Sequence, residues 1–312
     1  PNTTLIKSAA IMLLVTSYFL APALEARPQQ LGIALAFLIC LQVTSQPQTS
    51  TGWLLAALLP LAFWHVLSFF FAIAYLSVWK LILWRLGSLR GGAILLWFVL
   101  ASSLLVSLIG SRAYRSLLED VLANHLPDQF TLALLIISSV LLATCFCAVP
   151  VRLWKKVRAL CLSHINVVVA IIFLLSATAL ILQWRLLPST ALQDYGGSAV
   201  IFCMWHAGNV GFFFCYMLGL KLCLTGEVKG LQAFVIGSLI LLVLASFALL
   251  ASFFLAHVNW MIRILYFWVP FAAPLSALGL GKLLSHAGKF RHFILVCLFM
   301  ASLSHVVRLS IL

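Results

Sequence analysis

The sequence predicts an all-α protein, a polytopic integral membrane bundle of about ten transmembrane helices that forms a single domain over residues 1–312. Three observations support this fold class. Hydrophobic residues make up 64% of the chain and charged residues only 8%, whereas soluble domains carry about 25% charged residues. The mean hydropathy is +1.18. Long apolar runs recur along the whole chain, and no polar loop between them is long enough to form a second domain.

A helix needs about 20 apolar residues to cross a bilayer, and apolar runs separated by charges or turn residues recur at this spacing. We expect the first run to be a retained helix and not a cleaved signal peptide, because its N-terminal side holds only one basic residue, Lys7. The second run is short, and a re-entrant segment is the alternative there. The expected helices lie near residues 8–24, 30–45, 53–79, 92–110, 131–150, 160–183, 198–220, 231–256, 264–281 and 292–311.

Basic residues are divided unequally between the two sets of connecting loops. Thirteen lie on one side: Arg27, Lys80, Arg85, Arg90, Arg152, Lys155, Lys156, Arg158, Lys221, Lys229, Lys282, Lys289 and Arg291. Six lie on the other side: Lys7, Arg112, Arg115, Arg185, Arg263 and Arg308. Cytoplasmic loops of membrane proteins carry the excess of Lys and Arg, so the first side is predicted to be cytoplasmic. The net charge of +13 is therefore attributed to membrane orientation and not to nucleic-acid binding. Four of the six carboxylates fall on the predicted outer side: Glu119, Asp120, Asp128 and Asp194.

Two outer segments carry arginines close to carboxylates. In GSRAYRSLLEDVLANHLPDQF (110–130), Arg112 and Arg115 share a helix face, and Glu119 follows four residues later. In LILQWRLLPSTALQDYGGSAV (180–200), Arg185 ends a helix and Asp194 lies in the turn before the next one. One interpretation is structural: residues 110–130 form an amphipathic connector with ordinary salt bridges, and residues 180–200 hold an interfacial residue followed by a turn. The other is an anion site, because the planar guanidinium group binds phosphate in a bidentate manner.

The stretch MWHAGNVGFFF (204–214) places polar residues inside an apolar run. His206, Asn209 and Phe213 have the spacing of one helix face, and Gly208 and Gly211 would allow a neighbouring helix to approach closely. Ionisable residues inside a membrane are candidates for function. The alternatives are a neutral histidine that is hydrogen-bonded between helices and a haem ligand.

A second polar group opens the ninth expected helix, in HVNWMIRILYFWVPFAAP (257–274). Arg263 is followed by Tyr266, Pro270 and Pro274. Proline kinks a spanning helix and frees backbone carbonyl groups, so an arginine at the mouth of such a helix can face a cavity. The alternative is an arginine that extends to the interface.

The last 50 residues start with RILYF (263–267) and continue with a proline-broken apolar run, a short basic loop and one final helix. This region, about a sixth of the chain, resembles the C-terminal end of Wzy-type and EpsG-type polysaccharide polymerases. SRAYR (111–115) is similar to the Ser–Arg segments of the O-antigen ligase and polymerase group. The resemblance implies a polymerase or glycosyltransferase that acts on polyprenyl-diphosphate-linked glycans at the outer face of a bacterial inner membrane.

On this hypothesis, arginines hold the diphosphate and a nearby group acts as general base for an acceptor hydroxyl. The diphosphate leaves as a stabilised anion, so no metal or other cofactor is required. The partners are the lipid-linked glycan, membrane lipid and other envelope-assembly proteins. The predicted substrate-binding residues are Arg112, Arg115, Arg185, Asn209, Arg263 and Tyr266, and the candidate bases are Asp194, Glu119 and His206.

Two alternative functions use the same residues differently. The first is a redox membrane subunit that binds haem or quinone through His65 and His206. The second is a transporter that moves an anionic lipid, or another anion, through a basic cavity. The near absence of carboxylates inside the apolar runs argues against transport coupled to protons or sodium ions.

Overall fold

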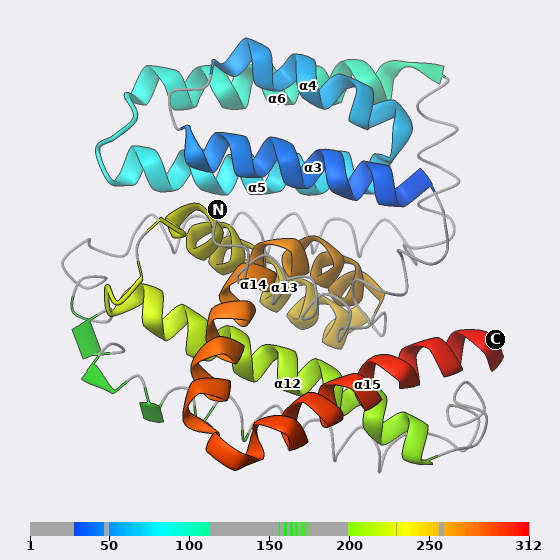
Figure 1. The fold of residues 1–312 in the computed structure, drawn as a ribbon. Coiled ribbons are helices and arrows are strands. Elements are labelled where there is room, and N and C mark those ends of the chain that lie inside the picture. Colours follow the sequence, from blue (N-terminus) through cyan, green and yellow to red (C-terminus); the bar gives the residue numbers. More distant parts are fainter. Residues whose placement is uncertain are drawn as a thin grey trace. The chain divides into compact units, whose positions relative to one another are not determined.

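In the computed structural model of the protein, every regular element among the described residues is a helix (Figure 1), which confirms the all-α prediction for this part of the chain. The helices are α3 (Pro28–Ser45), α4 (Thr51–Trp64), α5 (Val66–Arg85), α6 (Gly91–Gly110), α12 (Ala199–Leu224), α13 (Gln232–Leu255), α14 (Asn259–His286), the short 3₁₀ helix η1 (Gly288–Phe290) and α15 (Arg291–Ile311). The described residues are 28–46, 50–112, 156, 159–160, 163–164, 166–167, 170–171, 174, 199–228, 230–255 and 259–311.

Three of these helices are long and apolar enough to cross a membrane. They contain the segments Ser68–Arg85, Gly91–Leu108 and Tyr266–His286. Together with the composition, they indicate a membrane protein. The count of about ten spanning helices stays a prediction, because several of the expected helices lie outside the described residues.

The chain divides into two compact units. The first consists of Pro1–Ala26, Lys155–Ser238 and Trp268–Leu312, and the second of Arg27–Trp154 and Leu239–Phe267. Each unit is built around its own helix contacts.

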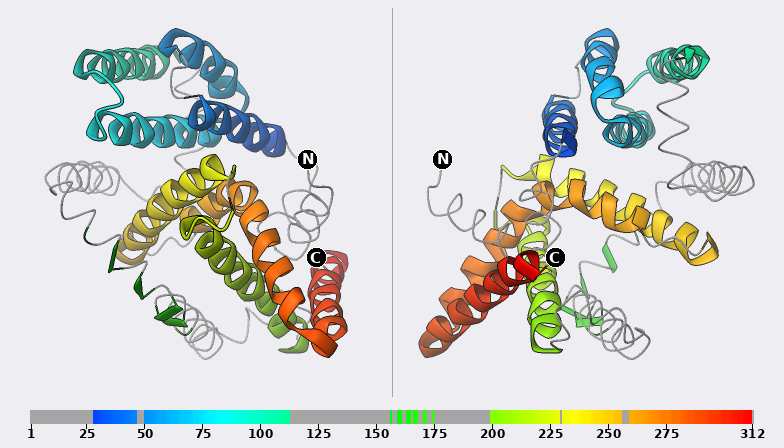
Figure 2. Two further views of the ribbon diagram at one scale, coloured as in Figure 1. Left: turned by 60° about the vertical axis from the view of Figure 1, so that its left-hand side comes forward. Right: turned by 90° about the vertical axis from the view of Figure 1, so that its right-hand side faces the viewer.

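In the second unit, α3, α4, α5 and α6 run in alternating directions, and α5 contacts the other three (Figures 1 and 2). The buried residues of α5 recur every three or four positions, which is the spacing of one helix face. Two polar contacts join the helices. The Tyr75 hydroxyl is 2.7 Å from Thr44 Oγ1, and the Trp97 indole N–H donates to Ser77 Oγ at 3.1 Å. The buried residues of α5 are Ser68, Phe69, Ala72, Ile73, Tyr75, Leu76, Trp79, Lys80 and Leu83.

The predicted single helix over 53–79 is wrong, because the chain breaks at His65. This residue has φ −150° and ψ 91°, and it separates α4 from α5. Its Nδ1 accepts a hydrogen bond from the Ser68 backbone N–H at 3.1 Å, so the imidazole caps the first turn of α5. Histidine is not a usual N-cap residue, and no other residue of the apolar run predicts a helix end at this position.

The break adds one reversal of the chain and changes the predicted topology. The start of α3 lies at the end of the second unit where α5 begins, because a Cβ atom at Gly32 would collide with the His65 side chain. The turn between α5 and α6 lies at the opposite end (Figure 1). The predicted topology places the start of the helix over 30–45 and the end of the helix over 53–79 on the same side of the membrane. The second unit contradicts this, because α3 and α5 run in the same direction, so the start of α3 and the end of α5 lie at opposite ends. Arg27 itself lies outside the described residues.

The first unit is organised by a close crossing of α12 and α14. A Cβ atom at Gly219 would collide with the backbone carbonyl group of Leu275, and one at Gly279 would collide with that of Cys215. The contact is reciprocal: each helix supplies one glycine and one carbonyl group. On each helix the glycine follows the residue with the contacted carbonyl group by four positions. Glycines at such spacing let two backbones touch, which is a common way for helices to associate in lipid.

Polar and aromatic contacts extend this crossing. The Ser276 hydroxyl donates to the Phe212 carbonyl oxygen of α12 at 3.3 Å. The Trp268 ring meets Tyr216 edge-on, with centroids 5.0 Å apart. The buried Tyr216 hydroxyl donates to Ser238 Oγ of α13 at 3.1 Å, and a buried hydroxyl requires such a partner. α12 is therefore bonded to both α13 and α14.

We predict that Gly219→Ala and Gly279→Ala each destabilise the protein by about 1–3 kcal/mol, because the added methyl group meets fixed backbone atoms. Thermal unfolding of the purified protein in detergent measures this. Gly211→Ala and Gly281→Ala are matched controls on the same two helices, since a Cβ atom at either position meets nothing within 4 Å. Alanine favours the helix by about 1 kcal/mol there. Equal unfolding midpoints for Gly219→Ala and Gly211→Ala would contradict the crossing.

Candidate functional site

Five of the nine predicted site residues lie on described segments. Arg112 is exposed just beyond the end of α6. His206 and Asn209 lie on α12, and Arg263 and Tyr266 lie on α14. The other four, Arg115, Glu119, Arg185 and Asp194, lie outside the described residues. The convergence of all nine around one substrate therefore stays a prediction.

The stretch around His206 is helical, as its apolar spacing predicts. α12 begins at Ala199, next to the expected start at Ser198, and Asn209 is half-buried. One detail of the prediction is wrong. Gly211 was expected to admit a neighbouring helix, but a Cβ atom there meets nothing within 4 Å. The close approach occurs about two turns later, at Gly219, because the partner backbone passes there.

α14 is longer than the predicted helix over 264–281. It begins at Asn259, so Arg263 and Tyr266 lie in its first two turns, and it continues through Pro270 and Pro274 to His286. Tyr266 is half-buried. The ring of the adjacent Phe267 packs against Phe71 of α5, with centroids 4.7 Å apart. The predicted polar residues thus stand on a well-packed apolar helix.

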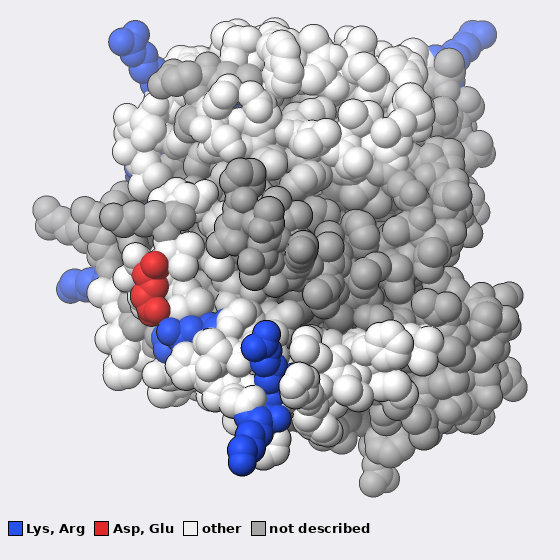
Figure 3. Space-filling view, viewed as in Figure 1, with Lys and Arg blue, Asp and Glu red and all other residues white. Residues whose placement is uncertain are grey.

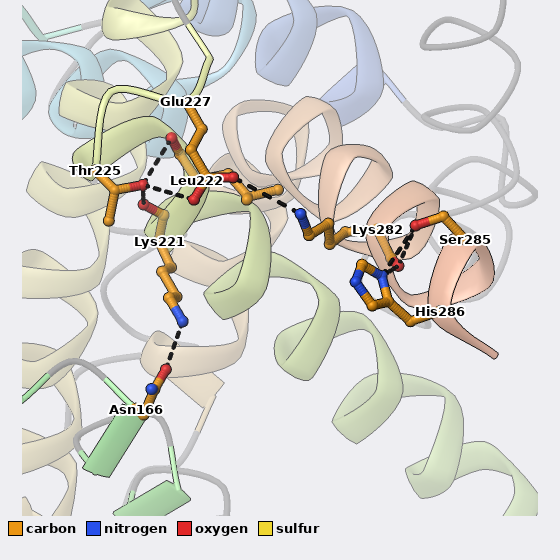
Figure 4. A network of polar contacts seen from close by, with 8 residues as sticks. All are labelled: Asn166, Lys221, Leu222, Thr225, Glu227, Lys282, Ser285 and His286. Atoms are coloured by element: carbon orange, nitrogen blue, oxygen red, sulfur yellow. Dashed lines mark hydrogen bonds and ion pairs between the residues drawn. The ribbon is translucent and has the colours of Figure 1, made fainter.

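A polar network joins the C-terminal ends of α12 and α14 (Figure 4). Glu227 Oε2 lies 3.8 Å from Lys282 Nζ, and Glu227 Oε1 lies 3.2 Å from the Thr225 hydroxyl. Lys221 Nζ donates to Asn166 Oδ1 at 2.5 Å. The predicted topology places Lys221, Glu227 and Lys282 on the cytoplasmic side, and this placement stays a prediction. The ion pair brings the segment just after α12 beside the last two turns of α14.

Gly226 allows the chain reversal that brings Glu227 into this network. Gly226 has φ +83°, a conformation that favours glycine, and it follows the last turn of α12. The chain reverses there and carries Glu227 to Lys282 of α14. Sequence reasoning did not foresee this pairing. The available signal was a glycine just beyond a helix, with the carboxylate one residue further on.

Basic side chains gather on this end of the first unit. They lie in the last turns of α12 and α14 and at the start of α15, where cations also oppose the negative ends of the first two helix dipoles. The His286 Nδ1–H donates to the Lys282 carbonyl oxygen at 2.8 Å, and the Ser285 hydroxyl donates to the same oxygen at 2.7 Å. We call the following set the basic rim: Lys221, Lys282, His286, Lys289 and Arg291.

His65, a predicted ligand in the redox alternative, serves as a helix cap. Its Nδ1 is 3.1 Å from the Ser68 nitrogen and 2.5 Å from Ser68 Oγ. Ser68 is buried, and the imidazole also packs beside Gly32 of α3. These contacts give His65 a role in joining α3, α4 and α5.

Comparisons with protein-family models, with curated proteins and with solved structures found no match for this chain.

We predict that His65→Ala lowers the free energy of unfolding by about 1 kcal/mol, because the first turn of α5 loses its cap. His65→Asn, which keeps a capping acceptor, should retain most of the stability. Thermal unfolding in detergent compares the two variants, and His164→Ala, at an exposed histidine, is the control. If His65→Asn were as unstable as His65→Ala, capping would not be the role of this residue.

Proposed function

We propose that the protein is a multi-pass enzyme of a bacterial inner membrane that polymerises or transfers glycans carried on polyprenyl diphosphate. One observation carries the proposal. The RILYF segment, which opens the region that resembles polysaccharide polymerases, lies near the start of the long apolar helix α14 and places Arg263 and Tyr266 in its first two turns. An arginine at the beginning of a spanning helix suits a lipid-linked anion, because the diphosphate lies at the level of the headgroups while the polyprenyl chain stays in the bilayer.

The proposed reaction is a displacement at the anomeric carbon of the donor glycan. An acceptor hydroxyl attacks this carbon, the bond from the carbon to the diphosphate oxygen breaks, and polyprenyl diphosphate leaves as an anion. A general base takes the hydroxyl proton; Asp194, Glu119 and His206 are the candidates.

The arginines would act on the charge of the leaving group. Arg112, Arg115, Arg185 and Arg263 would bind the diphosphate and stabilise the negative charge that develops as the bond breaks. Asn209 and Tyr266 would donate hydrogen bonds to the substrate. Because arginine supplies the positive charge, this reaction runs without a metal ion.

We predict that Arg263→Ala lowers polymer formation about 100-fold, the effect expected when one group that stabilises developing charge is removed. The assay supplies the purified protein in liposomes with lipid-linked repeat units and separates the products as a glycan ladder on a gel. A transporter would make no polymer in this assay. Arg90→Ala is the matched control, because Arg90 is exposed in the turn before α6.

The decisive outcome concerns variants that reach wild-type levels in the membrane. Loss of the ladder in Arg263→Ala but not in Arg90→Ala supports the proposal. An unchanged ladder in Arg263→Ala contradicts it, as does the absence of polymer formation by the wild-type protein with its own repeat unit.

A further inference from the structure

The basic rim is a concentration of exposed positive charge with a single counter-charge. On the face drawn in Figure 3, Lys and Arg side chains lie near a single acidic side chain. Glu227 is the only carboxylate among the described residues. It faces Lys282, and the two side chains are 51% and 48% exposed. Neither Lys289 nor Arg291 has an ion-pair partner among the described residues. The rim therefore carries excess positive charge that is available to an external anion.

The internal ion pair is weak enough to be displaced. The Lys282–Glu227 distance of 3.8 Å is longer than a hydrogen bond. Exposed pairs of this kind contribute little to stability. The ammonium group of Lys282 can therefore turn to a stronger acceptor at no large cost to the fold. Glu227 would compete with such an acceptor for the same cation.

The position of the rim along α14 points to a lipid as the source of the anion. The apolar segment Tyr266–His286 is long enough to span a bilayer, and the rim lies at its end. Exposed aromatic side chains alternate with the cations there. Phe290 is 72% exposed and Phe293 is 66% exposed. Aromatic residues and cations at the end of a spanning helix lie at the level of the lipid headgroups.

We infer that the basic rim binds the phosphate group of an anionic membrane phospholipid, and that Glu227 is an internal competitor that weakens this binding. Lys282, Lys289 and Arg291 supply the charge, and Phe290 and Phe293 lie among the acyl chains. The inference is independent of the proposed function, since the rim lies at the opposite end of α14 from Arg263.

Native mass spectrometry of the detergent-solubilised protein, titrated with phosphatidylglycerol, tests the inference. The wild-type protein should bind phosphatidylglycerol in preference to phosphatidylcholine, and Lys282→Gln with Lys289→Gln should weaken binding about fivefold for each cation removed. Glu227→Gln should tighten binding. Arg90→Gln, which removes an exposed charge from the second unit, should leave it unchanged. Lys282→Arg keeps the charge and should bind like the wild type.

Three results would overturn the inference. The first is equal phosphatidylglycerol affinity in the wild type and the Lys282→Gln, Lys289→Gln variant. The second is weaker binding in Glu227→Gln. The third is displacement of the lipid by inorganic phosphate at concentrations similar to that of phosphatidylglycerol, because this would identify a site for soluble phosphate. Unfolding midpoints of all variants are measured first. If the double variant fails to fold, the single Lys289→Gln variant, at an exposed position of η1, decides the outcome.

Discussion

The first unit depends on the direct contact between the backbones of α12 and α14. Lipid tails are as apolar as leucine, so no hydrophobic force drives two helices together inside a bilayer, and close packing must take its place. Gly219 and Gly279 provide this packing, because each faces a carbonyl group of the other helix with no side chain between them. The ion pair between Glu227, which follows the last turn of α12, and Lys282 of α14 adds a second contact between the two helices.

The same helix pair links the two proposed activities through α14. Arg263 and Tyr266 stand in its first two turns, and Lys282 and His286 stand in its last turn. The apolar segment between these ends is long enough to cross a membrane. A lipid-linked substrate at one end and an anionic phospholipid at the other would be separated by the thickness of the bilayer. The unequal distribution of basic residues along the sequence is consistent with this division, since membrane proteins keep most of their positive charge on one side.

The apolar runs predict most of the described helices. They do not predict which residues of two helices come into contact. α6 and α13 lie within one residue of the predicted bounds at each end. The break at His65 was missed because it depends on a capping bond from an unusual residue inside a continuous apolar run. The prediction named Gly208 and Gly211, and the contact lies at Gly219, because the spacing of glycines does not reveal where a partner backbone passes. For the site, charge placed Glu227 and Lys282 on one side, but their pairing required the reversal at Gly226.

Cross-linking in isolated membranes tests most directly whether α12 and α14 contact each other in the membrane as they do in the structure. Cysteines replace Glu227 and Lys282 in a chain whose eight native cysteines have been removed. A short bifunctional thiol reagent is added, and the linked peptides are identified by mass spectrometry. We predict an intramolecular link between positions 227 and 282, since Glu227 Oε2 and Lys282 Nζ lie 3.8 Å apart. If both cysteines react with the reagent but no peptide linked between positions 227 and 282 is found, the contact between α12 and α14 is contradicted.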